Sequence, residues 1–213
     1  MPLQNRVNPF GQIITSSARG AWMGNRGILH KNKIIVRNYK LPSWIICKLE
    51  FKDRRRSIMA DNNYTELFFL DEATAYAAGH RPCAECRRDA FNAFKDAWKA
   101  ANKNTYALPD DKIISIDKII HHDRIDQNGQ KITYKEQLQN LPNGVFVKLN
   151  ESDDTYLYYD RKLLKWNEAD YSEMLQLPLT TFVDVLTPKS IVNLFSIGFE
   201  VDIHHSAKQL LNS

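Results

Sequence analysis

The most regular hydrophobic pattern in the chain runs from Cys86 to Ala101 and predicts an amphipathic helix. Apolar residues recur there with the spacing of one helix face, whereas Lys95, Asp96 and Lys99 fall outside that face. A second helix is predicted around Ser115–Arg124, with a face of three isoleucines, Ile116, Ile119 and Ile120. Both apolar faces are explained by burial in a core and require no ligand.

Strand patterns dominate the two ends of the chain. Up to about Leu49, β-branched runs alternate with glycines, and Ser43–Phe51 has the apolar content of a buried strand. After Leu141 the pattern predicts a small antiparallel sheet with a hairpin. Its predicted strands are Val145–Leu149, Thr155–Tyr159, Thr181–Leu186 and Phe199–Ile203. We also expect a short helix in Tyr134–Leu141, and a helix that begins at Thr187-Pro188 and is terminated by Gly198.

The segment Phe68–Arg88 combines several local signals. It predicts a strand, a short helix, a tight turn with the sequence Cys-x-x-Cys, and then the helix described above. Asp71 is suited to the N-cap of the short helix and Gly79 to the position just after its end. The rest of the chain is organised around this segment.

These elements predict an α+β fold. We expect an N-terminal β segment with the Cys-x-x-Cys module in residues 1–104, and a helical connection with a small β-rich region in residues 105–213. The two parts can also form one compact domain. The 213 residues include no apolar run long enough for a membrane span and no secretory leader, and the three cysteines are too few and odd in number for a disulfide framework. A cytoplasmic protein is therefore expected.

Two of the three cysteines, Cys83 and Cys86, have the spacing of half a metal site. A turn that leads into a helix N-terminus lets two sulfurs converge, and nearby arginines favour thiolates. Cys47, at the end of the predicted strand Ser43–Phe51, is the candidate third ligand. A redox pair would require a thioredoxin-like context that is absent, and three ordinary buried cysteines are the remaining alternative.

The residues Phe68–Cys86, above all Ala78-Gly79-His80-Arg81-Pro82-Cys83-x-x-Cys86, resemble the zinc-binding N-terminal domain of the Ada family of DNA methylphosphotriester repair proteins. The resemblance covers only about Trp44 to Arg88. It implies a zinc ion held by Cys47, Cys83 and Cys86, with Cys47 as the thiolate that accepts a methyl group. The family has a fourth cysteine four residues after the first, but Phe51 stands at that position here.

The fourth ligand is then a histidine or a water molecule. His80 takes a place that is aromatic in the Ada module, where packing is the expected role. His121 is our choice, because it lies at a predicted helix end with Asp123 two residues later, which can orient an imidazole or act as a base. Cys47, His121 and Asp123 are thus the candidate catalytic residues.

The expected function is binding of nucleic acid, or a reaction on it, and the resemblance implies DNA repair. The net charge of +4 is mildly basic. The candidate contacts to the phosphate backbone are Arg54, Arg55, Arg56, Arg81, Arg87 and Arg88. The segment Ala18–Gly27, with three glycines and two arginines around Trp22, can cradle a phosphate, although turns between strands are the favoured interpretation.

Two other classes stay open. One is a zinc enzyme with an open site of three cysteines, with or without a histidine, of a hydrolase or deaminase-like kind. The deaminase motif has its glutamate two residues after the metal ligand, whereas Glu50 is three residues after Cys47. A strand would also place Cys47 and Glu50 on opposite faces. The other class is a structural zinc protein with an interaction role.

Overall fold

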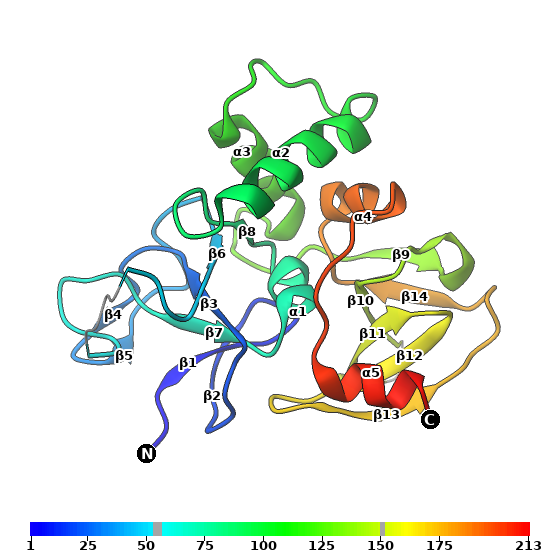
Figure 1. The fold of residues 1–213 in the computed structure, drawn as a ribbon, viewed down its shortest axis with the longest axis horizontal. Coiled ribbons are helices and arrows are strands. Elements are labelled where there is room, and N and C mark those ends of the chain that lie inside the picture. Colours follow the sequence, from blue (N-terminus) through cyan, green and yellow to red (C-terminus); the bar gives the residue numbers. More distant parts are fainter. Residues whose placement is uncertain (53–56, 150–151) are drawn as a thin grey trace.

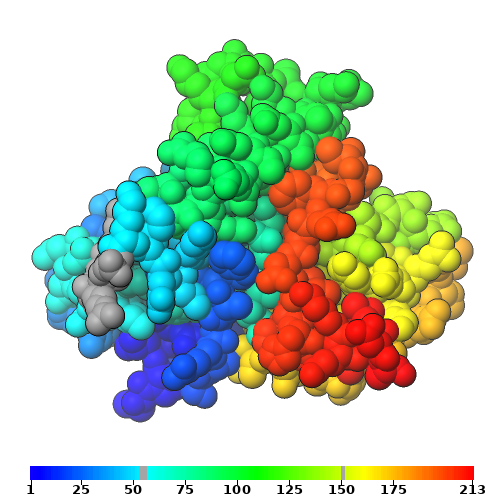
Figure 2. Space-filling model, in the orientation of Figure 1, coloured from blue at the N-terminus to red at the C-terminus, as the bar shows by residue number. Residues whose placement is uncertain are grey.

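The computed structural model describes residues 1–52, 57–149 and 152–213. Over these residues the chain forms five α-helices, two six-stranded sheets and one two-stranded sheet (Figure 1). This composition confirms the predicted α+β class. In the space-filling view, the N-terminal part in blue and cyan and the C-terminal part in yellow and red lie side by side beneath the green helices (Figure 2). None of the helices within the described ranges is long and apolar enough to cross a membrane.

The first sheet is formed by the N-terminal part of the chain and has the order β2-β1-β7-β3-β6-β8. Its strands pair antiparallel except for β1 with β7 and β6 with β8, which are parallel. The strands are β1 (Gln4–Val7), β2 (Ile13–Thr15), β3 (Trp22–Asn25), β6 (Ile45–Cys47), β7 (Leu67–Phe69) and β8 (Arg81–Pro82). Strands β4 (His30–Lys31) and β5 (Ile34–Ile35) form the separate two-stranded sheet.

The second sheet is antiparallel throughout and has the order β13-β12-β11-β10-β14-β9. It contains the predicted hairpin, in which Val145 lies opposite Tyr158 and Lys148 opposite Thr155. Its strands are β9 (Tyr134–Gln137), β10 (Val145–Lys148), β11 (Thr155–Tyr159), β12 (Lys162–Trp166), β13 (Tyr171–Leu175) and β14 (Phe182–Val185).

The short helix α1 (Glu72–Ala77) lies between the two sheets and contacts β3 and β7 of the first and β10 of the second. All of its residues are buried. Helix α4 (Lys189–Ser196) packs against α2 (Arg88–Asn102) and α3 (Ile113–Arg124), and α5 (His205–Leu211) packs on β13. Helices α2 and α3 confirm the two helices that the hydrophobic spacing predicts.

Local hydrogen bonds fix both ends of α1 as the sequence predicts. The Asp71 carboxylate caps the helix by accepting from the Thr74 N–H (2.8 Å) and the Thr74 hydroxyl (2.7 Å). The same carboxylate accepts from the Tyr171 hydroxyl at 2.8 Å and from the His204 N–H at 3.0 Å. Gly79 follows the helix with φ of +85°, and a Cβ there would lie 2.4 Å from Cδ of Arg124. Only glycine fits this position.

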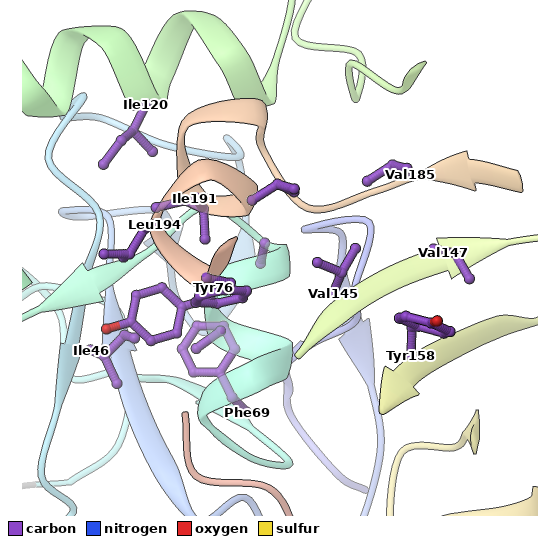
Figure 3. Packing of buried hydrophobic residues seen from close by; sticks show 14 of the residues in the cluster. Ile46, Phe69, Tyr76, Ile120, Val145, Val147, Tyr158, Val185, Ile191 and Leu194 are labelled. Atoms are coloured by element: carbon purple, nitrogen blue, oxygen red, sulfur yellow. The ribbon is translucent and has the colours of Figure 1, made fainter. Parts of the chain in front are cut away.

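One large cluster of buried hydrophobic side chains surrounds α1 and joins the two sheets (Figure 3). Tyr76 points from α1 into this cluster, near Phe69 of the first sheet and Leu194 of α4. The cluster contains residues from both sides of the predicted division at residues 104 and 105, including Trp98 and Val185. Burial of this size is the main source of stability in a chain of this length.

Two of the predicted elements are wrong, and one helix is not predicted. Tyr134–Leu141 is not an α-helix, because β9 pairs with β14 over four residues, and only Leu138–Asn140 forms a 3-10 turn. Phe199–Ile203 forms no strand; its extended backbone instead bonds to α1, where the Ala73 N–H donates to the Asp202 carbonyl. The C-terminal residues, for which no element is predicted, form α5. In each case tertiary contacts outweigh a weak local preference.

We predict that Asp71→Ala lowers the free energy of unfolding by about 2–4 kcal/mol. The loss combines an N-cap, about 1 kcal/mol, with two buried donors left without an acceptor, Tyr171 O–H and His204 N–H. Urea denaturation measures the change. The control is Asp111→Ala, since the Asp111 side chain is 80% exposed and a surface ion pair contributes little to stability. Similar losses for the two variants would contradict the central role of Asp71.

Candidate metal centre

The pairing of three strands brings Cys47 and Cys83 together. Cys47 ends β6 and lies opposite Met23 of β3. On the other side of β6, Ile46 pairs with Pro82 of β8, and the Cys83 N–H donates to the Ile46 carbonyl at 2.9 Å. Cys83 is therefore held next to Cys47, although 36 positions separate them in the sequence.

A tight turn then returns Cys86 to the same place. The Arg87 N–H donates to the Cys83 carbonyl at 3.1 Å, and the Glu85 N–H donates to the Cys83 sulfur at 3.4 Å. Helix α2 begins directly after the turn. The predicted arrangement, a Cys-x-x-Cys turn that leads into a helix, is observed.

The three sulfurs lie within 4.8 Å of one another, and the three thiols are free and buried. Sulfurs that share a tetrahedral metal ion with metal–sulfur bonds of about 2.3 Å are separated by roughly 3.8 Å. The observed group therefore needs little adjustment to hold a metal ion. Within the ranges that the structure describes, no other set of three histidine, cysteine or acidic side chains meets the same criterion.

Hydrogen bonds to sulfur make the group receptive to a cation. The Cys47 thiol donates to Cys83, and together with backbone N–H donors of Cys86 and Glu85 it lowers the pKa of Cys83 to about 5. The pKa of Cys47 is raised by that shared proton and by burial, and burial also raises the pKa of Cys86. Metal binding would displace the remaining protons, since thiolates are the ligands.

A cavity of about 600 Å³ lies beside the sulfurs. Its wall is largely apolar and includes Met23 and Phe51, which pack against the cysteines. Phe51 thus occupies the surroundings of the site without offering a ligand atom. Three carboxylate side chains also line the cavity, those of Glu50, Glu66 and Glu85.

The group of converging ligand atoms includes neither His121 nor Asp123, so the structure does not bring the predicted fourth ligand and these two predicted catalytic residues to the cysteines. The His121 ring packs 5.0 Å from Tyr39 and 6.2 Å from Trp44, and its Nδ1 accepts from Arg124. Trp44 and Cys47 are an odd number of residues apart in an extended segment, so their side chains point to opposite faces.

The Asp123 side chain instead forms hydrogen bonds that hold secondary-structure elements together. Its carboxylate accepts from the Tyr106 hydroxyl at 2.9 Å and from the Ser190 N–H at 3.0 Å, at the start of α4. This side chain therefore caps α4 from α3 and neither orients His121 nor reaches a thiol.

Two of the predicted phosphate-contacting arginines are buried in ion pairs. Arg81 forms a two-pronged pair with Asp117 at 2.9 and 2.8 Å. Arg87 pairs with Glu72 and stacks on Trp22 at 4.0 Å. These ion pairs hold β8 and the cysteine turn to neighbouring elements, and the guanidinium groups do not face solvent. The partner carboxylates are remote in sequence, so the sequence pattern does not reveal them.

Arg88 is exposed at the first residue of α2. Arg54, Arg55 and Arg56 lie outside the described residues. For these four arginines contact with nucleic acid stays a prediction.

His80 is fully buried between Phe69 and Trp44 and accepts a hydrogen bond from Arg26 at 3.1 Å. The packing role expected for His80 agrees with this position. Sequence reasoning missed the other members of this environment, Arg26, Arg124 and Lys131. The one available signal was Arg26 itself, which lies in the glycine-rich segment that was considered for phosphate.

Comparison with known protein families, curated proteins and solved structures finds no match to this chain.

We predict that the protein loses stability as the pH falls from about 6.5 towards 4. Burial and Arg124 lower the pKa of His121 to about 4, and burial with Arg26 lowers the pKa of His80 well below its usual value. In the unfolded chain both titrate near 6.5. Below that pH the unfolded chain binds protons that the folded chain does not, so the stability present above pH 6.5 is lost on acidification.

Denaturation midpoints at several pH values measure this dependence. His121→Gln keeps an acceptor for Arg124 and should flatten the decline, whereas Gln127→Ala, at an exposed neighbour that does not titrate, should leave it unchanged. A decline that is identical in wild type and His121→Gln would show that His121 does not contribute.

Proposed function

We propose that the chain is a zinc protein in which Cys47, Cys83 and Cys86 hold one ion and a fourth coordination position opens to the adjacent cavity. The observation that carries the proposal is the convergence of three buried sulfurs within 4.8 Å. Soft thiolate ligands in a tetrahedral arrangement favour zinc over the hard cations calcium and magnesium. The resemblance of Phe68–Cys86 to the Ada zinc module supports the same choice.

The fourth position distinguishes a reactive site from a structural one. Among the described residues, the ligand group contains three members and no histidine. A structural zinc site has four protein ligands, whereas a site with three keeps a position for water or substrate. The cavity of about 600 Å³ beside the sulfurs provides the space for such a ligand.

This arrangement favours a zinc-dependent reaction. When bound, the ion would act as a Lewis acid or lower the pKa of a bound water. The carboxylates of Glu50, Glu66 and Glu85 at the cavity can take up a proton. Cys47, at the end of β6, supplies the third thiolate beside Cys83 and Cys86.

We predict that the purified chain binds about one zinc ion and that Cys83→Ser, Cys86→Ser and Cys47→Ser each reduce the bound metal several-fold, because each removes one of the three ligands. His121→Gln is the control and should retain the full content. Elemental analysis of protein purified without chelator gives the stoichiometry.

Cobalt replacement tests the open position. The cobalt protein should show thiolate charge-transfer absorption, and added azide should shift its visible bands. Bands that do not respond to azide would show a closed, structural site. Bands altered by His121→Gln would restore His121 as a ligand and refute the arrangement proposed here.

A second candidate function is binding of nucleic acid near the cysteines. The exposed Arg88 at the start of α2 and the net charge of +4 favour it. Each phosphate contact releases counterions, so the logarithm of the affinity falls with the logarithm of salt concentration.

We predict that Arg88→Ala reduces that salt slope by about one unit, and that joint replacement of Arg54, Arg55 and Arg56 by Ala reduces it further. The control is Arg161→Ala, at an exposed arginine in the turn between β11 and β12, which should leave the slope unchanged. Fluorescence anisotropy with labelled single- and double-stranded DNA and RNA measures the slope. Absence of salt-dependent binding to all four probes would refute this candidate.

A further inference from the structure

A second cavity, of about 530 Å³, lies between the two halves of the chain. It is formed by the segment around Gly11, by Arg26 after β3, by Tyr39 and by residues of and after α3. Arg124, Lys131 and Lys148 contribute positive charge to its wall, and Asp184 contributes the negative charge. Trp44 directs its side chain here, opposite to Cys47, so this cavity is separate from the metal centre.

Two buried arginines enclose the Trp44 ring. The guanidinium carbons of Arg26 and Arg124 lie 3.8 and 3.6 Å from the ring centre, and the two residues are 0% and 1% exposed. Contact with an aromatic face attracts a cation but supplies no net negative charge. Because both guanidinium groups pack on the Trp44 ring and donate to backbone carbonyls, their positions are fixed before any ligand arrives.

The hydrogen-bond partners of these cations are neutral. Arg26 donates from Nη1 to the Gly11 carbonyl at 2.9 Å and from Nε to His80. Arg124 donates to the carbonyls of Gly79 at 2.8 Å and Pro42 at 2.6 Å. Lys131 donates to the Ala77 carbonyl at 2.5 Å.

No described carboxylate forms an ion pair with Arg26, Arg124 or Lys131. The carboxylate of Asp117 is engaged by Arg81, and that of Asp184 by Lys135 at 3.3 Å. Burial, reinforced by the two arginines, lowers the pKa of Lys131 to about 7, and burial lowers the pKa of Arg26 to about 9. Buried charges without a counter-charge are costly, and in proteins they are normally paired.

Each of the two arginines also has one buried donor atom that lacks an acceptor among the described residues. These are Nη2 of Arg26 and Nε of Arg124. The Arg26 atom lies close to Gly11, another residue of the cavity wall, since a Cβ built on Gly11 would lie 3.8 Å from it. A fully buried guanidinium with a free N–H at a cavity wall is arranged to receive an acceptor from outside the chain.

We propose that this cavity binds a phosphate monoester, whose phosphate group pairs with Arg26, Arg124 and Lys131. A phosphate dianion matches several cations better than a single carboxylate does, and planar guanidinium groups bind phosphate oxygens in pairs. The cavity is in the size range of small-molecule sites, so the ligand carries an organic group beyond the phosphate. A free nucleotide and the phosphorylated end of a nucleic-acid strand share this chemistry.

The test compares thermal unfolding of the full chain in sodium phosphate and in sodium chloride at equal ionic strength, with calorimetric titration of inorganic phosphate and of nucleoside 5′-monophosphates. Phosphate should raise the unfolding temperature of wild type, because a ligand of the native state stabilises it. Lys131→Met should weaken phosphate binding about tenfold or more, through loss of one charged hydrogen bond. Lys112→Met, at an exposed lysine, is the control and should bind as wild type does.

Lys131→Met also separates binding from a purely structural role. If the cations serve only to hold backbone segments together, the variant loses stability and phosphate stabilises neither protein. If they form an anion site, the variant is at least as stable as wild type in chloride, because repulsion among the cations is reduced. The variant Arg26→Lys keeps the positive charge but loses the paired N–H donors of the planar guanidinium group, so it should also weaken phosphate binding.

Further probes identify the source of the phosphate. Tighter binding of a nucleotide than of inorganic phosphate supports a nucleotide ligand, whereas preference for a 5′-phosphorylated oligonucleotide over its 5′-hydroxyl form supports a strand end. Absence of stabilisation of wild type by phosphate, or equal stabilisation of wild type and Lys131→Met, would overturn the proposal. Equal affinity for succinate would overturn the assignment to phosphate. None of these outcomes depends on the metal content.

Discussion

The buried carboxylate of Asp71 is the constraint on which the rest of the structure depends. A six-residue helix has little stability of its own, because nucleation is unfavourable and few hydrogen bonds follow it. Asp71 caps α1 and in the same place accepts from Tyr171 and His204, which belong to the C-terminal half. The helix is therefore fixed at its first turn to the second sheet, while its buried side chains pack between both sheets.

The capped helix α1 in turn sets the position of the segment that directly follows it. Gly79 turns the chain out of the helix and leaves room for Arg124, which packs directly over it. The next residues enter β8 beside β6, so that Cys83 and Cys86 meet Cys47. One short segment thus contacts both proposed sites, because Gly79 and His80 accept hydrogen bonds from Arg124 and Arg26, and Cys83 is one of the three sulfur ligands. Arg81 lies between His80 and Cys83 in the sequence, and its buried ion pair with Asp117 connects β8 to α3.

The two sites differ in what the fold adds to them. At the sulfurs, protein donors and one shared proton already stabilise negative charge, so the group is suited to a cation. At Trp44 the arginines donate to neutral acceptors, and no described carboxylate forms an ion pair with them, so the group is suited to an anion. Each group includes one residue of the extended segment Trp44–Cys47. Because side chains alternate between the two faces of such a segment, Trp44 and Cys47 lie on opposite faces.

The sequence by itself determined the α+β class, the helices around α2 and α3, the hairpin of β10 and β11, and the caps of α1. It also determined the group of Cys47, Cys83 and Cys86. These features depend on spacing along a few neighbouring residues, or on a cysteine at a strand end, and such local signals are visible in one dimension. Only the tertiary structure decided that His121 and Asp123 lie away from the sulfurs, that Arg81 and Arg87 are buried, and that β9 is a strand. The same holds for the arrangement of Arg26 with Arg124 and Lys131, since Arg26 is distant in sequence from the other two. A long polar side chain has no fixed partner until folding places a carboxylate, a carbonyl or an aromatic ring beside it, and that choice depends on contacts between remote segments.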